Sequence, residues 1–223
     1  MIQLFHVSKA YGRCQALQDV NLEIGKGDFV LLMGSSGAGK STLLRLLFGG
    51  EQPDEGQILV QGQNIATMSG RQIPQLRRRM GIVFQDFRLL TKRTVFENVA
   101  LPLMVSGASG QDIRRKVSEA LRAVGVEHKR EHLPTRLSAG EQQRVAIARA
   151  IVNSPIILLA DEPTGNLDPH LTADIVELFK QINARGTTVV VATHDPQVMR
   201  QVNRRVLTLR NGQILADQQG VGG

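Results

Sequence analysis

GSSGAGKS, residues 34–41, is the stretch of this sequence that decides the fold. It matches the pattern G-x-x-x-x-G-K-[ST] of the phosphate-binding P-loop. The apolar run before it, DFVLLMG at 28–34, is typical of a strand buried on both faces, and STLLRLLFG at 41–49 predicts a helix. A chance match to a turn is the alternative, and the flanking strand and helix argue against it. This order of elements predicts an α/β protein with a P-loop.

The residue types of the P-loop suit a nucleoside triphosphate and its metal ion. Its glycines permit backbone angles that turn successive N–H groups toward phosphate oxygens. Lys40 would reach the β- and γ-phosphates and assist catalysis, and the Ser41 hydroxyl would bind Mg²⁺. The residues expected to contact the nucleotide here are Gly34, Ser35, Ser36, Gly37, Ala38, Gly39, Lys40, Ser41 and Thr42.

An acidic pair supplies the partner that a P-loop needs for its metal. Asp161 and Glu162 follow the apolar run IILLA at 156–160, which predicts a buried strand. Strands of a parallel sheet deliver their carboxyl ends to the edge where ligands bind. Asp161 would hold Mg²⁺ through water, and Glu162 would polarise the attacking water as general base. Adjacent acids are common in surface loops, but the buried strand before them favours a catalytic pair.

Two further polar residues close apolar runs in the same way. His194 ends TTVVVATH at 187–194, and Gln85 ends GIVFQ at 81–85. A histidine at a strand end is more often a structural hydrogen-bonding residue. With a P-loop and an acidic pair at the same sheet edge, we expect His194 to contact the γ-phosphate. The amide of Gln85 could face the metal or water, so Gln85 joins Ser41 and Asp161 as a predicted metal ligand.

The remaining pattern predicts one domain over residues 1–223, with a mixed, mainly parallel sheet as its core. Val20, Leu22 and Ile24 alternate with polar residues, which predicts a small N-terminal antiparallel sheet with one wet face. Residues 87–137 read as amphipathic helices and predict an inserted helical subdomain. The other elements expected are a strand at 57–65, a short helix at 71–79 interrupted by Pro74, a helix opened by Asp168 and Pro169, a hairpin turn at Asn211 and Gly212, and a loose tail at 218–223.

The composition is that of a globular protein whose size allows a sizeable core. The 223 residues are 42% hydrophobic and 21% charged, and the one cysteine, Cys14, excludes an internal disulfide. The net charge of +7 includes basic runs at 77–80, 113–116 and 203–205, which favour solvated helix faces over a membrane-surface role. Aromatic residues make up only 4% and are not interleaved with these runs, so a stacking platform for nucleic acid is not expected.

The chain shows no segment that would carry it into a bilayer. Its first residues, MIQLFHVSKAYG, lack the pattern of a signal peptide. The longest apolar runs fall far short of the roughly 18 residues that a membrane span needs. If the protein serves a membrane process, another chain must span the membrane.

LSAGEQQR at 137–144 admits two readings. Ser138 and Glu141 have the spacing of a capping box at a helix start, and the apolar residues that follow supply its buried face. A helix start with small residues also leaves N–H groups and a partial positive charge that suit a phosphate. The two readings are compatible, because Ser138 can start the helix while its free N–H groups face a nucleotide of another subunit.

Taken together and in this order, the motifs resemble those of the nucleotide-binding subunits of ABC transporters over essentially the whole chain. The motifs that carry the resemblance are GSSGAGKST, Gln85, LSAGE, LLADEPT, NLD at 166–168 and His194. The resemblance implies that Tyr11 stacks on the adenine of ATP, that Gln85 starts a mobile loop, and that His194 is a switch residue. It also implies that residues 166–168 lie at a subunit boundary. Without it, the spacing of Tyr11 indicates only a half-exposed strand or turn residue.

The stretch at 137–141 resembles the family signature, usually written LSGGQ. It implies that Ser138, Gly140 and Glu141 lie against ATP held by the P-loop of a second subunit. Ala139 and Glu141 depart from the usual pattern. We expect Ala139 in the first helical turn, where it favours the helix by up to ~1 kcal/mol over Gly. We expect Glu141 to face the helix start as the capping-box acid.

The resemblance implies a homodimer that closes head to tail around ATP and Mg²⁺, hydrolyses ATP at Glu162 and drives an integral membrane partner at the cytoplasmic face of the inner membrane. VSKAYG, GIVFQDFRLL, TVFENVALPL, SGASGQDIRR and LADEPTGNLD resemble the branch that works in bacterial cell division. Lipoprotein-release and macrolide-export ATPases are similar through the same stretches. Soluble ABC ATPases that bind nucleic acid, and a binding module without catalysis, are the more distant alternatives.

Overall fold

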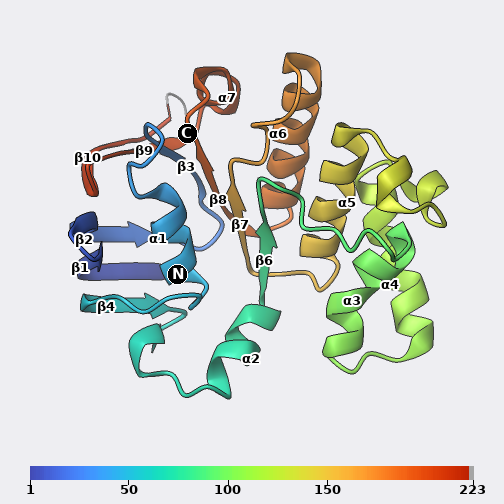
Figure 1. Ribbon diagram of the computed structural model, residues 1–223, viewed down its shortest axis with the longest axis horizontal. Helices are drawn as coiled ribbons and strands as arrows, with labels where there is room; N and C mark the ends of the chain where they lie inside the picture. The colour runs from blue at the N-terminus through green and yellow to red at the C-terminus, as the bar shows by residue number, and fades with distance from the viewer. Residues whose placement is uncertain (221–223) are drawn as a thin grey trace.

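The computed structural model describes residues 1–220, in which two β-sheets pack together and helices cover the outer face of the larger sheet (Figure 1). The smaller sheet is antiparallel, in the order β2-β1-β4-β5. Its strands are β1 (Ile2–Tyr11), β2 (Cys14–Ile24), β4 (Glu55–Val60) and β5 (Gln63–Asn64). The predicted N-terminal antiparallel sheet is therefore confirmed.

The larger sheet has the order β10-β9-β3-β8-β7-β6 and is parallel except for its edge strand β10. Its strands are β3 (Phe29–Met33), β6 (Met80–Val83), β7 (Ile157–Asp161), β8 (Thr188–Thr193), β9 (Arg205–Arg210) and β10 (Gln213–Gln218). The mixed, mainly parallel core sheet is as predicted. Because its central strands are parallel, the segments that follow β3, β6, β7 and β8 all leave from one edge.

Both faces of the larger sheet are buried, as the continuous apolar runs of its strands indicate. In β3, Leu31 belongs to the core on the side of the outer helices, and Leu32 belongs to the core shared with the smaller sheet. Helix α1 (Lys40–Leu47) lies in that second core, between the two sheets. The P-loop at its start is thus held between two packed layers.

The outer helices form a continuous group on the other face of the sheet (Figure 1). They are α3 (Val95–Val105), α4 (Gly110–Ala123), α5 (Ala139–Ile151), α6 (Pro169–Ala184) and α7 (Pro196–Val202), with single 3-10 turns at Glu127–Lys129 and Pro134–Arg136. Helices α3 and α4 pack on α5 and lie farthest from the smaller sheet. Val117 and Leu121 of α4 are buried, as their spacing predicts.

The starts of α5 and α6 confirm the capping chemistry predicted from the sequence. At α5, the Glu141 N–H donates to Ser138 Oγ at 3.3 Å, and the Ser138 N–H donates to Glu141 Oε2 at 2.8 Å. Ala139 is the first helical residue, as expected. At α6, Asp168 Oδ1 accepts the N–H groups of His170 and Leu171, and Pro169 takes the first helical position, where its missing N–H costs nothing.

Several predicted details are wrong. Pro74 does not interrupt its helix, α2 (Gln72–Arg78), because it lies in the first turn, where an N–H would have no intrahelical acceptor. The strand predicted at 57–65 is broken between β4 and β5 by a turn in which Gln61 has a φ of 52° and Gly62 one of 74°. Gln85 lies in a turn beyond β6, which ends at Val83.

The C-terminal region agrees with the predicted hairpin and shortens the predicted tail. Asn211 and Gly212 join β9 to β10 with φ angles of 48° and 77°, as a type I′ turn requires. Of the tail predicted at 218–223, Gln218 ends β10, and residues 221–223 lie outside the described residues.

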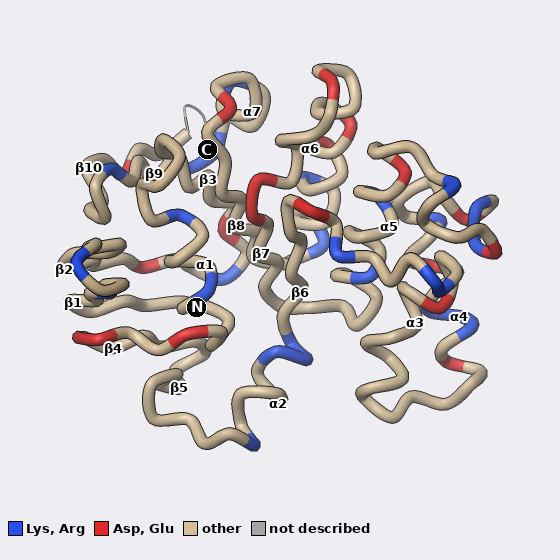
Figure 2. Tube along the Cα trace, viewed as in Figure 1, with Lys and Arg blue, Asp and Glu red and all other residues tan. Residues whose placement is uncertain are grey.

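Basic residues lie on α2, α4 and α5, and in α4 acidic residues are interspersed with them (Figure 2). In α4, for example, Arg115 pairs with Glu119 at 3.0 Å. The run at 203–205 does not lie on a helix face: Arg205 begins β9 and pairs with Asp217 at 2.7 Å. Between residues 1 and 220, no helix is long and apolar enough to cross a membrane.

Candidate nucleotide site

The P-loop has a backbone that only glycine allows at its critical positions. Gly37 and Gly39 have φ angles of 77° and 107°, in the left-handed region. A Cβ on Gly39 would lie 2.4 Å from the carbonyl oxygen of Ala16, and one on Gly34 would lie 2.4 Å from that of Leu209. The loop is therefore seated directly on the backbone of β2 and β9, which fixes the N-terminus of α1 at the edge of the sheet.

Lys40, the first residue of α1, is buried beneath this loop. Its Nζ donates to the carbonyl oxygens of Gly34 at 2.8 Å and Ser35 at 3.1 Å, and it lies 3.2 Å from Glu162 Oε1. The Lys40 side chain is only 5% exposed, and its ammonium group has just one carboxylate within ion-pair distance among the described residues. A buried cation facing the loop interior is suited to phosphate oxygens.

Ser41 and Asp161 form the second contact across the site. The Ser41 hydroxyl donates to Asp161 Oδ1 at 3.0 Å. Burial raises the pKa of the Asp161 carboxyl, the Ser41 hydrogen bond opposes this rise, and the neighbouring Glu162 charge adds to it. A buried carboxylate next to a second carboxylate gains free energy from a cation. The two oxygen ligands fit Mg²⁺, which prefers oxygen and keeps several of its waters.

Glu162 contacts both Lys40 of the P-loop and the residues at the end of β8. Its backbone N–H donates to the carbonyl of Ala192 at 2.8 Å, and its φ of 47° is in the left-handed region, which non-glycine residues seldom adopt. Its carboxylate accepts the His194 N–H at 3.3 Å and lies 2.9 Å from His194 Nδ1. The strained turn thus aims the carboxylate at both Lys40 and His194.

Tyr11 lies at the end of β1, half-exposed, beside the start of α1. Its hydroxyl donates to Glu51, which also pairs with Arg45 of α1 at 3.4 Å. Lys9 Nζ lies 5.8 Å from the centre of the Tyr11 ring. Burial raises the pKa of the Tyr11 hydroxyl, and the Glu51 hydrogen bond adds to the rise. The hydrogen bond from the hydroxyl to Glu51 fixes the orientation of the ring, and a planar base could stack on the ring.

Gln85 lies beside the segment that follows Glu162, and among the described residues it makes no hydrogen bond to Ser41 or Asp161. Its backbone carbonyl oxygen accepts a hydrogen bond from Asn166 Nδ2 at 3.3 Å. A Cβ on Gly165 would lie 3.4 Å from Gln85 Nε2. The ligation of a metal by Gln85 stays a prediction.

Ser138, Gly140 and Glu141 lie at the start of α5, among the outer helices and well apart from α1 (Figure 1). Glu141 faces the helix start, as expected. Its pKa is lowered, first by the Ser138 N–H and then by Lys129, which lies 3.2 Å away. In one chain this helix start therefore cannot reach a nucleotide on the P-loop.

Sequence reasoning missed three polar residues that hold the site together. Glu51 anchors Tyr11. Gln143 of α5 donates to the carbonyl of Pro163, next to Glu162. Arg149 of α5 donates to the carbonyls of Phe87 and Arg88 in the loop after Gln85. Gln143 carries a detectable signal, because it is a polar residue three positions after Gly140 on the buried face of an amphipathic helix.

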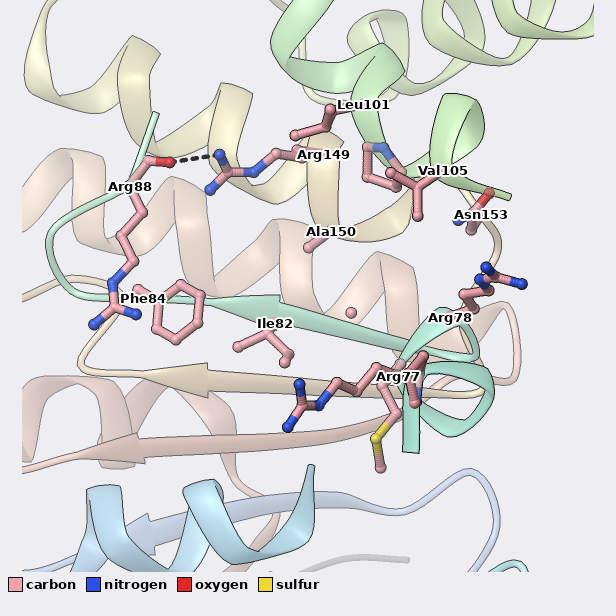
Figure 3. Close-up of a pocket in the computed structure, with 14 residues that line it drawn as sticks. Arg77, Arg78, Ile82, Phe84, Arg88, Leu101, Val105, Arg149, Ala150 and Asn153 are labelled. Atoms are coloured by element: carbon pink, nitrogen blue, oxygen red, sulfur yellow. Dashed lines mark hydrogen bonds between the residues drawn. The ribbon is translucent and has the colours of Figure 1, made fainter. Parts of the chain in front are cut away.

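An apolar groove of about 500 Å³ runs between β6 and the outer helices (Figure 3). Phe84, Leu101 and Val105 line it, and Arg78 and Arg88 lie at its rim. Burial lowers the pKa of Arg149, whose guanidinium extends along the groove to the carbonyl of Arg88 (Figure 3). The groove therefore borders the same loop that begins at Gln85.

The fold and this arrangement of P-loop, acidic pair and histidine define an ABC-type ATP-binding cassette. A family model described as ABC transporter matches residues 17–165. The chain belongs to this family, as one of its ATPase subunits. It is 52% identical over 215 residues to the cell division ATP-binding protein FtsE of Escherichia coli K12, a match that covers 96% of this chain and 97% of that protein.

Other relatives and solved structures agree. FtsE of Mycobacterium tuberculosis is 50% identical over 221 residues, covering 98% of this chain and 96% of that protein. The dimeric bacterial ABC transporter cassette MJ0796 superimposes with a TM-score of 0.92 at 39% identity, with all of both chains covered. A post-hydrolysis dimer of MJ0796, bound to ADP and Pi, gives 0.91 at the same identity. The predicted resemblance to ABC ATPases, and within them to FtsE, is confirmed.

Proposed function

We propose that two copies of this chain close head to tail around two ATP molecules, and that hydrolysis drives an integral membrane partner of FtsX type in bacterial cell division. The observation that carries the proposal is the convergence of Lys40, Glu162 and His194 at one sheet edge, while Ser138 and Gly140 lie on a distant helix start. Each ATP site then needs one chain's P-loop and the other chain's signature helix.

The residues at this edge of the sheet have different roles in ATP binding and hydrolysis. The P-loop N–H groups and Lys40 bind the phosphates, and the Tyr11 ring stacks on adenine. Glu162 acts as general base on the attacking water. His194 holds the Glu162 carboxylate in place and contacts the γ-phosphate. Loss of the γ-phosphate bridge between the subunits would loosen the dimer after each turnover.

Ser41 and Asp161 would hold Mg²⁺, which supplies positive charge to the phosphates when it is bound. The raised pKa of Asp161 supports this assignment, because the buried carboxylate lacks a fully compensating cation. Gln85, at the start of the loop after β6, is the third ligand proposed for the metal. Arg149 of α5 donates to two carbonyls of that loop and also lines the groove. A movement of the loop at the ATP site would therefore change the groove as well.

The apolar groove is the proposed seat of a cytoplasmic segment of the membrane partner. In this proposal, residues 87–137 form a helical subdomain inserted into the sheet core, and the groove lies between the two. Leu101 and Val105 are 39% and 61% exposed there, and they line the same groove as Phe84, so together they form an apolar surface of the kind that marks interaction sites. The arginine rim favours an apolar segment that carries acidic residues. The chain would then sit peripherally at the cytoplasmic face of the inner membrane.

ATP turnover by the purified chain tests the enzymatic part of the proposal. Wild-type protein should release phosphate from ATP in the presence of Mg²⁺, and Lys40→Ala should abolish both ATP binding and release. Turnover that persists in Lys40→Ala would place the activity elsewhere.

Recruitment to membranes tests whether the groove binds the membrane partner. Arg78→Glu at the groove should reduce retention of the chain on vesicles that contain the partner protein, and should leave basal ATP turnover unchanged. Arg114→Glu, a matched change on exposed α4, is the control and should bind as the wild type does. Equal retention of all three proteins would exclude the groove.

The neighbouring gene separates the two transporter-like alternatives. An adjacent gene for a four-span membrane protein with one large extracytoplasmic loop would support the cell-division assignment. A neighbour of lipoprotein-releasing type would support that alternative instead, and pull-down from native membranes would decide between them.

A further inference from the structure

Gln143 is a polar side chain in the interior of the protein, at 0% exposure, and it joins two functional segments. It lies on α5, five residues after Ser138. Its Nε2 donates to the carbonyl oxygen of Pro163 at 2.6 Å, and Pro163 directly follows Glu162. A single buried amide therefore connects the signature helix to the loop that carries the proposed general base.

A second contact lies one turn earlier on the same helix face. A Cβ on Gly140 would lie 2.9 Å from Leu171 Cδ1, so the start of α5 packs directly on the start of α6. Leu171 in turn donates its N–H to Asp168 at 3.0 Å. The segment between β7 and α6, residues 162–168, is thus held at both ends by residues that α5 contacts.

Within residues 1–220, the Gln143 amide makes one hydrogen bond. Its Oε1 is buried and has no donor among the described residues. A buried acceptor without a donor raises the free energy of an arrangement. The amide can therefore gain a second hydrogen bond when the loop or the helix moves, which suits a joint between two working positions better than a rigid anchor.

We propose that Gln143 is a positioning residue that couples the two ATP sites of the dimer. The inference rests on the proposed function. In the head-to-tail dimer, Ser138 contacts ATP bound by the partner, whereas Glu162 acts on ATP bound by its own chain. Gln143 joins these two residues' segments within one chain, so engagement of α5 at one site sets the position of Glu162 at the other.

Steady-state ATP turnover as a function of ATP concentration tests the coupling. Gln143→Met keeps the length and volume of the side chain and removes the amide. It should lower kcat about tenfold or more, because Glu162 is no longer held in place. It should leave the KM within about twofold and lower the Hill coefficient of the wild type to about 1, because each site then works independently.

Asp174→Asn is the matched control. Asp174 of α6 pairs with Arg144 of α5 at 2.7 Å, so this change removes the charge from a contact between the two helices, away from residues 162–168. It should retain the wild-type kcat and Hill coefficient. If Asp174→Asn loses as much cooperativity as Gln143→Met, general packing of α5 on α6 is responsible and the inference is overturned.

Gln143→Asn keeps the test valid if Gln143→Met does not fold, because it retains a buried amide but shortens its reach to the Pro163 carbonyl. It should also lower the Hill coefficient, and unchanged cooperativity in whichever folded variant is measured would overturn the role of Gln143. A wild type that binds ATP without dimerising would refute the proposed function itself. A wild type that dimerises with ATP but turns it over without cooperativity would overturn the coupling alone.

Discussion

Lys40 Nζ lies 3.2 Å from Glu162 Oε1, so the group expected to bind the γ-phosphate and the group expected to activate water are in direct contact. Both side chains are shielded, at 5% and 12% exposure, and the attraction between them is therefore screened less than at a surface. Phosphate oxygens entering the loop must replace Glu162 and the two loop carbonyls at Lys40. Binding of ATP would thus release Glu162 toward the water that it activates.

His194→Ala should lower kcat about 10²- to 10³-fold, the usual effect of removing one group that stabilises developing charge. The reason is that the variant loses the His194 ring, whose Nδ1 lies 2.9 Å from the Glu162 carboxylate, and keeps only the backbone N–H at this position. Single-turnover and steady-state ATP hydrolysis measure the effect, and ATP affinity should stay close to that of the wild type. A large loss of affinity with normal kcat would contradict the assigned role.

Gly39→Ala should destabilise the protein more than Gly37→Ala. Both positions have left-handed φ angles, for which alanine costs about 1–2 kcal/mol. Only Gly39 faces backbone, since its Cβ would lie 2.4 Å from the Ala16 oxygen, whereas nothing lies within 4 Å of a Cβ on Gly37. The clash should add ~1–3 kcal/mol to the loss in free energy of unfolding. Urea unfolding of the two variants without nucleotide checks the difference, and equal losses would show that the loop is not seated on β2.

Glu141→Gln should lower the free energy of unfolding by about 0.3–1 kcal/mol at pH 7, because a charge at a helix N-terminus is lost. The pKa of Glu141 is lowered in the fold from its ordinary value of 4.5, so its stabilisation is complete above that value and is lost as the pH falls through the lowered pKa. The two proteins should therefore converge in stability in acid. ATP turnover should change little, and a many-fold gain would mean that Glu141 lies against the nucleotide.

Tyr11→Ala should weaken ATP binding by about 1–3 kcal/mol, the usual contribution of a stacked base. Tyr11→Phe keeps the ring, loses the hydroxyl that donates to Glu51, and should retain most of the affinity. Inorganic tripolyphosphate has no base, so its binding to all three proteins should be the same. Equal ATP affinity of Tyr11→Ala and the wild type would remove Tyr11 from the site.

The elements that could be predicted from the sequence are those with a strong local cause. β3, the P-loop and α1 follow from one motif between two apolar runs, and the carboxyl edge of a parallel sheet brings Asp161 and Glu162 to Lys40. The capping box of Ser138 and Glu141 is equally local. These features depend on neighbours within a few residues or on a general rule of sheet topology.

The contacts that could not be predicted join segments that lie far apart in the sequence. The Tyr11–Glu51 bond, the Gln143–Pro163 bond and the reach of Arg149 to the loop after β6 depend on how the layers pack. The position of Gln85 was also beyond local reasoning, because β6 ends two residues before it and the chain then turns toward Gly165. No periodicity within one segment specifies such contacts.

The oligomeric state of Glu162→Gln with ATP and Mg²⁺ tests the central claim most directly. The amide keeps the shape of the side chain and cannot act as a general base, so turnover should fall about 10²- to 10⁴-fold while ATP still binds. Light scattering coupled to size-exclusion chromatography should then show a stable dimer with ATP and a monomer after ATP is removed. Only monomer, in a sample proven to hold ATP, would contradict the two-chain ATP site.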